Sequence, residues 1–143
     1  MILFPVFSSH SYKNNFMSNV TAPSQKTAKK VLVIEDEGEI GLLLNIILNE
    51  KDFELDYVKD LSSADEYLQK NKPSLIFLDN KLPDGYGVDF ISYVKKKYPK
   101  IKIIMMTGFG TARDVALENG ADFFLEKPFS LDNVNQAIDQ VLS

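Results

Sequence analysis

The sequence predicts an α/β fold in which helices cover both faces of a doubly wound parallel sheet. Apolar runs of strand length alternate with segments whose apolar residues recur at helical spacing, which indicates repeated strand–helix units. Three of the runs, at residues 31–34, 75–78 and 103–106, contain no polar residue. Such strands are buried on both faces, as in a parallel sheet between two helical layers. A length of 143 residues with 45% hydrophobic content fits one domain with a single core, and no internal repeat indicates a second one.

The first part of the chain is predicted to form two strand–helix units. The first strand covers residues 30–34, and apolar residues recur every three or four positions in the helix that follows at 39–49. A short strand at 55–58 and a helix at 61–70 make the second unit. Pro73 closes that helix, because proline disfavours helical backbone at the residue before it.

The middle of the chain is predicted to continue with a strand, a loop and a helix. The third strand covers 75–78 and is followed at 79–87 by a loop dense in Pro, Gly and Asp. A helix at 88–98 ends before Pro99. The fourth strand follows at 101–106.

The last part of the chain contains a weak helix signal and a strong one. Glycines weaken the short helix predicted at 111–118, and the fifth strand is predicted at 121–125. The final helix begins after Ser130, whose hydroxyl suits the N-cap position. Its apolar residues recur on one side, and they are Leu131, Val134, Ile138 and Val141.

Composition excludes several kinds of function. The chain has no cysteine, so a disulfide framework, a thiolate nucleophile and a cysteine zinc site are excluded. Residues 1–30 carry four lysines and no acid, which leaves 12 basic and 20 acidic residues in the remainder. An acidic body repels phosphate backbones, so we expect no direct binding of nucleic acid.

The polar N-terminal segment, residues 1–29, is predicted to be a disordered tail before a domain at 30–143. The apolar residues 1–7 lack a preceding basic residue and are short for a signal core, so we expect neither a signal peptide nor membrane insertion. Met17 is an alternative start. A chain without cysteine suits a reducing compartment, and we expect a cytoplasmic location.

The polar residues that matter most lie where the apolar runs end. Glu35 and Asp36 follow the first run, Asp79 the third strand, Thr107 the fourth and Lys127 the fifth. The carboxyl ends of parallel strands share one edge of a sheet, so these side chains are expected to converge in one site.

Three carboxylates in one site need a positive partner. At an effective dielectric near 20, two unit charges ~4 Å apart repel by roughly 4 kcal/mol. Lys127 supplies one charge, and an all-oxygen ligand set with open positions suits Mg²⁺ better than Zn²⁺. A carboxylate beside such cations can attack phosphorus, and Asp79, alone at its strand end, is the candidate nucleophile. The Thr107 hydroxyl and the Lys127 ammonium can bind phosphoryl oxygens.

Four motifs occur in this order in the chain: VLVIEDE, LIFLDNKLPDGYG, IIMMTG and FFLEKPF. Together they resemble the receiver domain of two-component response regulators, over about residues 30–143. The resemblance implies a flavodoxin-like five-stranded sheet of order 2-1-3-4-5 with helices on both faces. It also implies a phosphoacceptor signalling domain, which catalyses only its own phosphorylation and dephosphorylation and is no conventional enzyme.

The resemblance also assigns the phosphoacceptor and the metal ligands. Asp79 would take a phosphoryl group from a histidine kinase or a histidine phosphotransfer protein. The metal would be Mg²⁺, with Mn²⁺ as the alternative ion. Asp36 would bind it directly together with Asp79, Glu35 would act largely through water, and Lys81 would contribute its backbone carbonyl.

The remaining roles concern the phosphoryl group once it is attached. Thr107 and Lys127 would contact it, and Phe124 would be the aromatic residue that turns inward as Thr107 moves. Because this residue is phenylalanine, switching would be by packing without a hydroxyl. Lys81 and Phe109 occupy positions where the family tunes phosphoryl lifetime. We hypothesise that Phe109 screens attacking water and that Lys81 pairs with the phosphoryl group.

The chain ends after its last predicted helix, so we expect a stand-alone, single-domain response regulator without an attached output domain. The signal would then pass by contact with a downstream protein target or by onward transfer of the phosphoryl group. A phosphorylation-independent, receiver-like protein-binding module is the alternative. The only histidine, His10, lies in the predicted tail, so the phosphodonor must be another molecule.

Two other functions fit the predicted architecture less well. A flavodoxin-like electron carrier would need a loop that cradles the phosphate of FMN after the first strand, where three successive acids, residues 35–37, repel phosphate. A phosphohydrolase of the haloacid dehalogenase type usually carries a second acid two residues after the nucleophile, and here that residue is Lys81.

Overall fold

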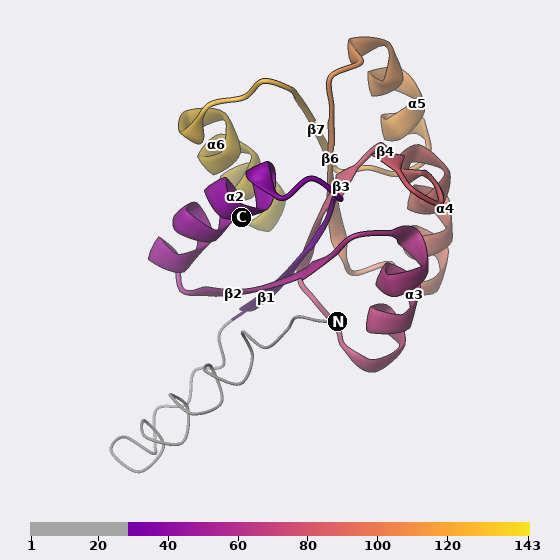
Figure 1. The fold of residues 1–143 in the computed structure, drawn as a ribbon, viewed down its shortest axis with the longest axis horizontal. Coiled ribbons are helices and arrows are strands. Elements are labelled where there is room, and N and C mark those ends of the chain that lie inside the picture. Colours follow the sequence, from indigo (N-terminus) through magenta and orange to yellow (C-terminus); the bar gives the residue numbers. More distant parts are fainter. Residues whose placement is uncertain (1–28) are drawn as a thin grey trace.

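A computed structural model describes residues 29–143, which form one five-stranded parallel sheet with helices on both faces (Figure 1). The strands are β1 (Lys29–Ile34), β2 (Phe53–Val58), β3 (Leu75–Asp79), β6 (Lys102–Thr107) and β7 (Phe123–Glu126). Their order, β2-β1-β3-β6-β7, is the 2-1-3-4-5 order expected from the resemblance. The predictions made for residues 1–28 lie outside the described residues.

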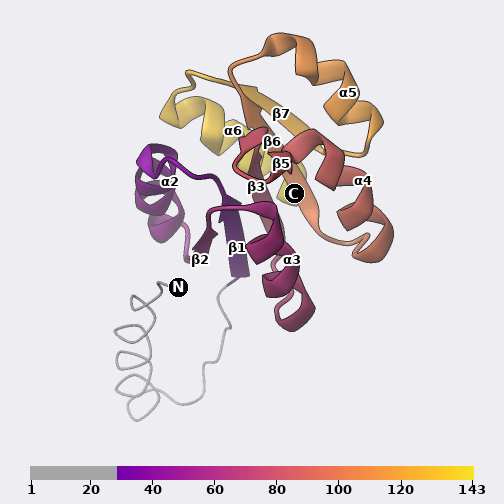
Figure 2. The ribbon, with the colours of Figure 1, turned by 45° about the vertical axis from the view of Figure 1, so that its right-hand side comes forward.

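Five α-helices of the described part divide between the two faces of the sheet. They are α2 (Glu39–Glu50), α3 (Leu61–Lys70), α4 (Gly87–Lys97), α5 (Arg113–Glu118) and α6 (Leu131–Leu142). Helices α2 and α6 cover one face, and α3, α4 and α5 cover the other (Figure 2). None of the helices in this part of the chain is both long enough and apolar enough to span a bilayer.

The core explains why three strands are apolar throughout. Leu32 and Ile34 of β1 are fully buried in the cluster on the α3, α4 and α5 side. Val31 and Val33, which alternate with them, are fully buried against α2 and α6. Because successive side chains of a strand point to opposite faces, both faces of β1 must be apolar. The two-sided burial predicted for this strand is confirmed, and β3 and β6 show the same pattern.

The region predicted as a loop at 79–87 contains a small hairpin. Strand β4 (Lys81–Leu82) pairs antiparallel with β5 (Gly85–Tyr86). Gly85 has φ 152°, a value that side chains rarely allow, which suits the residue that closes a two-residue turn. Two-residue strands are too short to show periodicity, so the hairpin could not be predicted from the apolar pattern.

The last two helices show where local sequence signals succeeded and failed. The Ser130 hydroxyl accepts a hydrogen bond from the Asn133 amide at 3.1 Å, which confirms the predicted N-cap. Leu131, predicted on the apolar side of α6, is 49% exposed because it occupies the first position of the helix. The helix predicted at 111–118 is a 3₁₀ turn, η1 (Gly110–Ala112), followed by the short α5.

Candidate functional site

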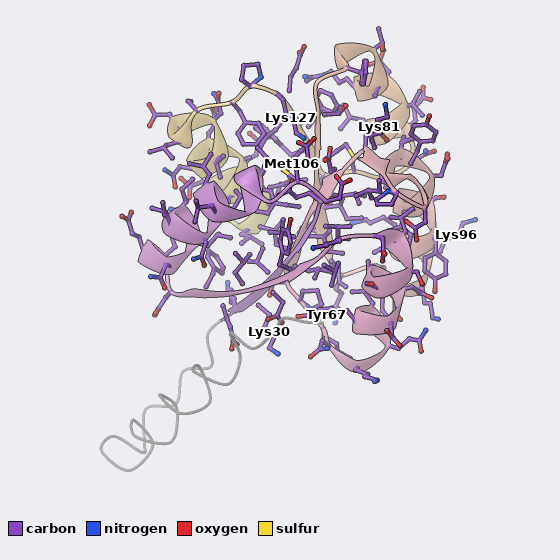
Figure 3. All side chains as sticks on the ribbon, in the orientation of Figure 1. Lys30, Tyr67, Lys81, Lys96, Met106 and Lys127 are labelled. Carbon is purple, nitrogen blue, oxygen red and sulfur yellow. The ribbon has the colours of Figure 1, made fainter. Side chains whose placement is uncertain are left out.

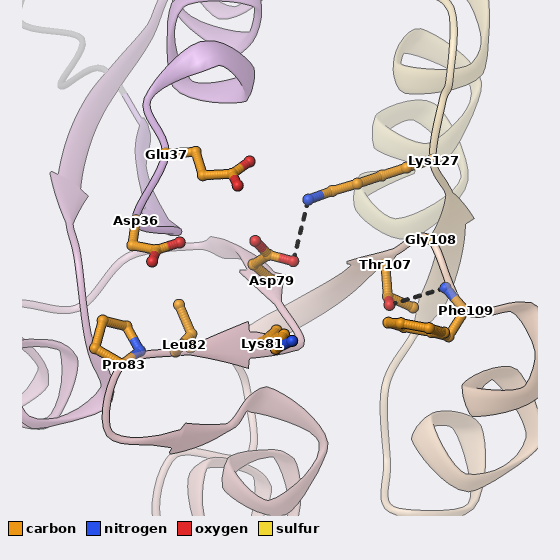
Figure 4. Close-up of a pocket in the computed structure, with 10 residues that line it drawn as sticks. All are labelled: Asp36, Glu37, Asp79, Lys81, Leu82, Pro83, Thr107, Gly108, Phe109 and Lys127. Atoms are coloured by element: carbon orange, nitrogen blue, oxygen red, sulfur yellow. Dashed lines mark hydrogen bonds and ion pairs between the residues drawn. The ribbon is translucent and has the colours of Figure 1, made fainter.

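A cavity of about 460 Å³ opens at the carboxyl edge of the sheet, where β1, β3, β6 and β7 end (Figure 4). Figure 3 shows Lys81 and Lys127 at this end of the molecule and Lys30 and Tyr67 at the opposite end. The residues that line the cavity are Asp36, Glu37, Asp79, Lys81, Leu82, Pro83, Thr107, Gly108, Phe109 and Lys127. The convergence predicted for Asp36, Asp79, Thr107 and Lys127 is therefore present.

Asp79 is the acid at the centre of this cavity. It is the last residue of β3 and is 6% exposed. Its Oδ1 accepts a hydrogen bond from the Asn80 amide at 2.9 Å and lies 3.2 Å from the Lys127 Nζ. The Lys127 ammonium therefore offsets the charge of a nearly buried carboxylate.

The chain after Asp79 is held close against the start of α4. The Gly87 amide donates to the Asn80 carbonyl at 2.7 Å, and the Val88 amide donates to Asn80 Oδ1 at 3.0 Å. A Cβ on Gly87 would lie 2.2 Å from the Asp79 carbonyl oxygen, far inside van der Waals contact. Glycine at this position allows α4 to approach the strand that carries Asp79.

Thr107 and Phe109 form the opposite wall. Thr107 ends β6, is 3% exposed, and accepts a hydrogen bond on Oγ1 from the Phe109 amide at 3.1 Å. The Lys127 amide donates to the Thr107 carbonyl at 2.9 Å, which fixes the two residues relative to each other. The Phe109 side chain is 61% exposed at the cavity wall, although it is apolar.

The three successive acids after β1 do not point the same way. Asp36 and Glu37 are exposed and line the cavity, as Figure 4 shows, but Glu35 is fully buried and is not among the lining residues. The Glu35 carboxylate instead accepts hydrogen bonds from three backbone amides and from the Tyr57 hydroxyl. Sequence reasoning did not single out Glu37 as a site residue, because nothing in residue type distinguishes it from its neighbours.

The inward position of Glu35 affects the pKa of the Tyr57 hydroxyl. The Tyr57 hydroxyl donates to Glu35 Oε1 at 3.3 Å. Burial, and then the neighbouring charge of Glu35, raise the pKa of Tyr57 above its usual value of 10. The phenol therefore stays protonated as a donor to Glu35 throughout the neutral range.

The β4–β5 hairpin is tied to α3 by a contact that the sequence did not indicate. Asp84 accepts hydrogen bonds from the Leu61 and Ser62 amides, each at 2.9 Å. These amides belong to the first turn of α3, which has no partners for them within the helix. The hairpin that carries Lys81 is thus attached to the neighbouring helix.

Phe124, the predicted switch aromatic, is already inside the molecule. It is 7% exposed and belongs to the core on the α3, α4 and α5 side. The Arg113 guanidinium lies 5.8 Å from the centroid of its ring, a distance at which a cation is attracted to an aromatic face. A change in Phe124 on phosphorylation stays a prediction.

The residues at the cavity fit a magnesium ion in one specific respect. Asp36 and Asp79 offer carboxylate oxygens to the same cavity. Within residues 29–143, no group of three or more acidic, histidine or cysteine side chains is arranged to hold a metal by itself. Mg²⁺ commonly binds through one or two carboxylates and keeps several waters, so this donor set suits it.

The fold and the site define a flavodoxin-like α/β domain with acids and a lysine gathered at the strand ends. Residues 31–139 match the model of the response regulator receiver domain. The chain therefore belongs to the receiver domain family of two-component signalling, whose members are phosphoacceptor modules.

Individual relatives show the same relationship. The chain is 36% identical over 107 residues to the phosphate regulon transcriptional regulatory protein PhoB of Escherichia coli, covering 72% of this chain and 47% of PhoB. It is 28% identical over 116 residues to sporulation initiation phosphotransferase F of Bacillus subtilis, covering 80% of this chain and 94% of that protein. The crystal structure of the receiver domain of NtrX from Brucella abortus superposes with a TM-score of 0.71 at 30% identity, covering 78% of this chain and 97% of that domain. The chain spans only about half the length of PhoB.

Proposed function

We propose that this protein is a single-domain response regulator that accepts a phosphoryl group on Asp79 from a histidine kinase or a histidine phosphotransfer protein. The observation that carries the proposal is the nearly buried Asp79 carboxylate, paired with Lys127 at 3.2 Å in a cavity shared with Asp36 and Thr107. A reactive carboxylate needs this combination of an accessible oxygen and a nearby cation. Membership of the receiver family supports the same conclusion.

In the proposed reaction, a carboxylate oxygen of Asp79 attacks the phosphorus of a phosphohistidine. An O–P bond forms, the N–P bond breaks, and its electron pair remains on the imidazole nitrogen of the donor. The Lys127 ammonium already lies beside Asp79, so it can neutralise charge first on the carboxylate and then on the phosphoryl oxygens. The Thr107 hydroxyl is the proposed donor to another phosphoryl oxygen.

Mg²⁺, with Mn²⁺ as the alternative, would neutralise charge on the transferring oxygens. Asp36 and Asp79 are the proposed carboxylate ligands, and Lys81 would add its backbone carbonyl. For Glu35, the sequence predicts a contact through water. Its carboxylate is bonded to the loop in the structure.

The proposed output is a change at a protein-binding face. A phosphoryl group adds about −1.5 to −2 charge next to Asp36 and Glu37, so the surrounding loops must rearrange to bring cations and donors to it. Thr107 and Phe124 are the proposed switch residues. The change would be read by a downstream protein target in the cytoplasm, or the phosphoryl group would be passed onward, without direct contact to nucleic acid.

The test is intact mass after incubation with a small acyl-phosphate donor, with and without Mg²⁺, for the wild-type chain and Asp79→Asn. We expect a gain of one phosphoryl group that requires Mg²⁺ and is absent from the variant. If a phosphorylated histidine phosphotransfer protein and the small donor both leave the wild-type mass unchanged, the phosphorylation-independent binding module replaces this proposal.

A further inference from the structure

We propose that Asn80 is a positioning residue for Asp79, and that Asn119 supports it from α5 by holding the same turn of α4. This inference rests on the proposed function, because it assumes that Asp79 accepts the phosphoryl group. Asn80 is a buried polar residue, yet neither it nor Asn119 is among the residues that line the cavity. Each would therefore act through the backbone around Asp79 and not by contact with the phosphoryl group.

Asn80 is bonded to two successive amides at the start of α4. Its carbonyl accepts from the Gly87 amide at 2.7 Å, and its Oδ1 accepts from the Val88 amide at 3.0 Å. The N-cap residue of α4, Tyr86, makes no side-chain hydrogen bond to the helix. The first amides of a helix have no partners within it, so Asn80 takes the place of the missing cap. Its side chain thereby attaches the first turn of α4 to the residue that follows the phosphoacceptor.

The same residue is bonded to the Asp79 carboxylate. The Asn80 amide donates to Asp79 Oδ1 at 2.9 Å, and this oxygen also lies 3.2 Å from the Lys127 Nζ. Hydrogen bonds weaken steeply when they bend, so this amide holds the carboxylate only while its peptide unit keeps its orientation. The bond that Asn80 Oδ1 accepts from α4 limits movement of that peptide unit. We therefore expect the direction of the Asp79 carboxylate to depend on the Asn80 side chain.

Asn119 holds the same turn of α4 from the neighbouring helix. Helices α4 and α5 lie next to each other on one face of the sheet (Figure 2). Asn119 directly follows α5, and its Nδ2 donates to the Val88 carbonyl at 3.1 Å. The Asn119 amide donates to the Val115 carbonyl at 3.0 Å, which fixes the asparagine to α5 itself. Val88 is thus held at its amide by Asn80 and at its carbonyl by Asn119.

These contacts form an unbroken series of hydrogen bonds from the site to the end of α5. The series runs through Asp79, Asn80, Val88 and Asn119, and each bond joins a side chain to a backbone group. Loss of one asparagine side chain would therefore break the series at one place. The rate of a transfer reaction depends strongly on the alignment of the reacting atoms. A substitution at Asn119 is thus expected to change a reaction at Asp79, which it does not touch.

The experiment measures the rate at which Asp79 gains a phosphoryl group, by intact mass, with a small acyl-phosphate donor in saturating Mg²⁺. The variants are Asn80→Ala, Asn119→Asp and the double variant. Asn45→Asp is the control, because it makes the same isosteric change at an exposed position of α2. The amide proton shift of Asn80 is recorded in ¹⁵N-labelled protein without donor, since it reports the hydrogen bond to Asp79. Urea unfolding measures the stability of each variant.

We expect Asn80→Ala to slow phosphorylation by about tenfold, because misplaced reacting atoms lose rate. Asn119→Asp cannot donate to Val88, so it should slow the reaction by a smaller factor, about threefold, and move the Asn80 amide proton upfield. Asn45→Asp should change neither quantity. The double variant should be about as slow as Asn80→Ala alone, because Asn119 acts through Asn80. A purely structural role would lower stability without this shared effect on the rate.

The inference is overturned if Asn80→Ala is phosphorylated at the rate of the control, or if the two single effects multiply in the double variant. It is also overturned if Asn119→Asp leaves both the rate and the Asn80 amide proton unchanged. Should Asn80→Ala fail to fold, the comparison of Asn119→Asp with Asn45→Asp decides alone. A wild-type chain that gains a phosphoryl group on Asp79, while Asn80→Ala keeps its rate, refutes only this inference. A wild-type chain that gains none refutes the proposed function as well.

Discussion

At the residue scale, Gly87 sets how closely α4 can approach the strand that carries Asp79. The space for its missing side chain is occupied by the Asp79 carbonyl oxygen. Gly108, which lies on the other side of the cavity, has nothing within 4 Å of the corresponding position. The two glycines therefore form a matched pair for testing close packing at the site.

Gly87→Ala is expected to lower the free energy of unfolding by about 1 to 3 kcal/mol, the usual cost of forcing extra volume into a packed region. Gly108→Ala is expected to stay within about 0.5 kcal/mol of wild type, as an unobstructed substitution does. Urea unfolding of both proteins measures this. Equal effects of the two substitutions would show that α4 can shift without cost.

A second residue-scale prediction concerns pH and Tyr67. The Tyr67 hydroxyl donates to Asp56 Oδ2, and Asp56 is 7% exposed. Burial, and then this contact, raise the pKa of Tyr67 above its usual value of 10. The unfolded chain releases this proton near pH 10 while the folded chain keeps it, so the contribution of Tyr67 to stability is present below pH 10 and is lost as the pH rises above it.

Tyr67→Phe should therefore be less stable than wild type by about 1 to 3 kcal/mol at pH 8, because Asp56 loses its donor. The difference in the free energy of unfolding between Tyr67→Phe and wild type should decrease as the pH rises above about 10. Urea unfolding between pH 8 and 11 measures the gap, with the exposed Tyr86→Phe as control. A gap that stays constant over this range would mean that Tyr67 ionises alike in both states.

The walls of the cavity lead to a prediction about phosphoryl lifetime. Phe109 is exposed at the cavity, and Lys81 lines the same space. The double variant Phe109→Ala, Lys81→Asn should lose its aspartyl-phosphate faster than wild type, because water would reach phosphorus more easily and the phosphoryl group would lack one cation. Decay is followed by intact mass after removal of the donor. Unchanged decay would eliminate both residues as determinants of lifetime.

Among the site residues, those at strand ends were predictable and those in turns were not. Asp79 and Thr107 end β3 and β6, and Lys127 directly follows β7, so the parallel sheet brings them together. Glu35 and Glu37 differ only in the direction of their side chains. Two glycines and a tyrosine from the next strand set that direction, and residue type alone does not report it.

At the element scale, the attachment of the β4–β5 hairpin to α3 is the contact with the clearest consequence. Asp84 in the turn of the hairpin accepts from the Leu61 and Ser62 amides. Two backbone donors at a helix N-terminus bind a carboxylate well, since the helix dipole favours negative charge there. The hairpin also supplies Lys81, Leu82 and Pro83 to the cavity wall.

Asp84→Ala is expected to reduce stability by about 0.5 to 2 kcal/mol, as loss of a helix cap does. Hydrogen exchange of the Leu61 and Ser62 amides should become faster. Asp114→Ala, which removes an exposed acid from the first turn of α5, is the control. If the two amides keep their protection in Asp84→Ala, the hairpin does not hold the start of α3.

Most helices and strands were predictable because their apolar periodicity extends over enough residues to be recognised. The helix predicted at 61–70 agrees with α3 at both ends, and Asp60 provides its N-cap. The elements that differed are short: a hairpin of two-residue strands, and a helix of six residues preceded by a 3₁₀ turn. Contacts from distant parts of the chain determine such elements more than local periodicity does.

At the scale of the whole molecule, the sheet keeps the residues that form the core apart from the residues that form the site. Apolar residues on both faces of β1, β3 and β6 hold the two helical layers, while the residues just past the strand ends form the site. The topology places the carboxyl ends of four strands around one cavity. The family resemblance carried by four short motifs implied the strand order that the structure shows, although β2 carries none of the motifs.

The central claim is that Asp79 is the residue that accepts the phosphoryl group, and one measurement tests it directly. Wild-type protein is phosphorylated in Mg²⁺, treated with sodium borohydride, which reduces an aspartyl-phosphate to homoserine, and digested for peptide mass spectrometry. We predict homoserine at position 79 and unchanged aspartates elsewhere. Homoserine at position 36 or another acid, with Asp79 intact, would contradict the account.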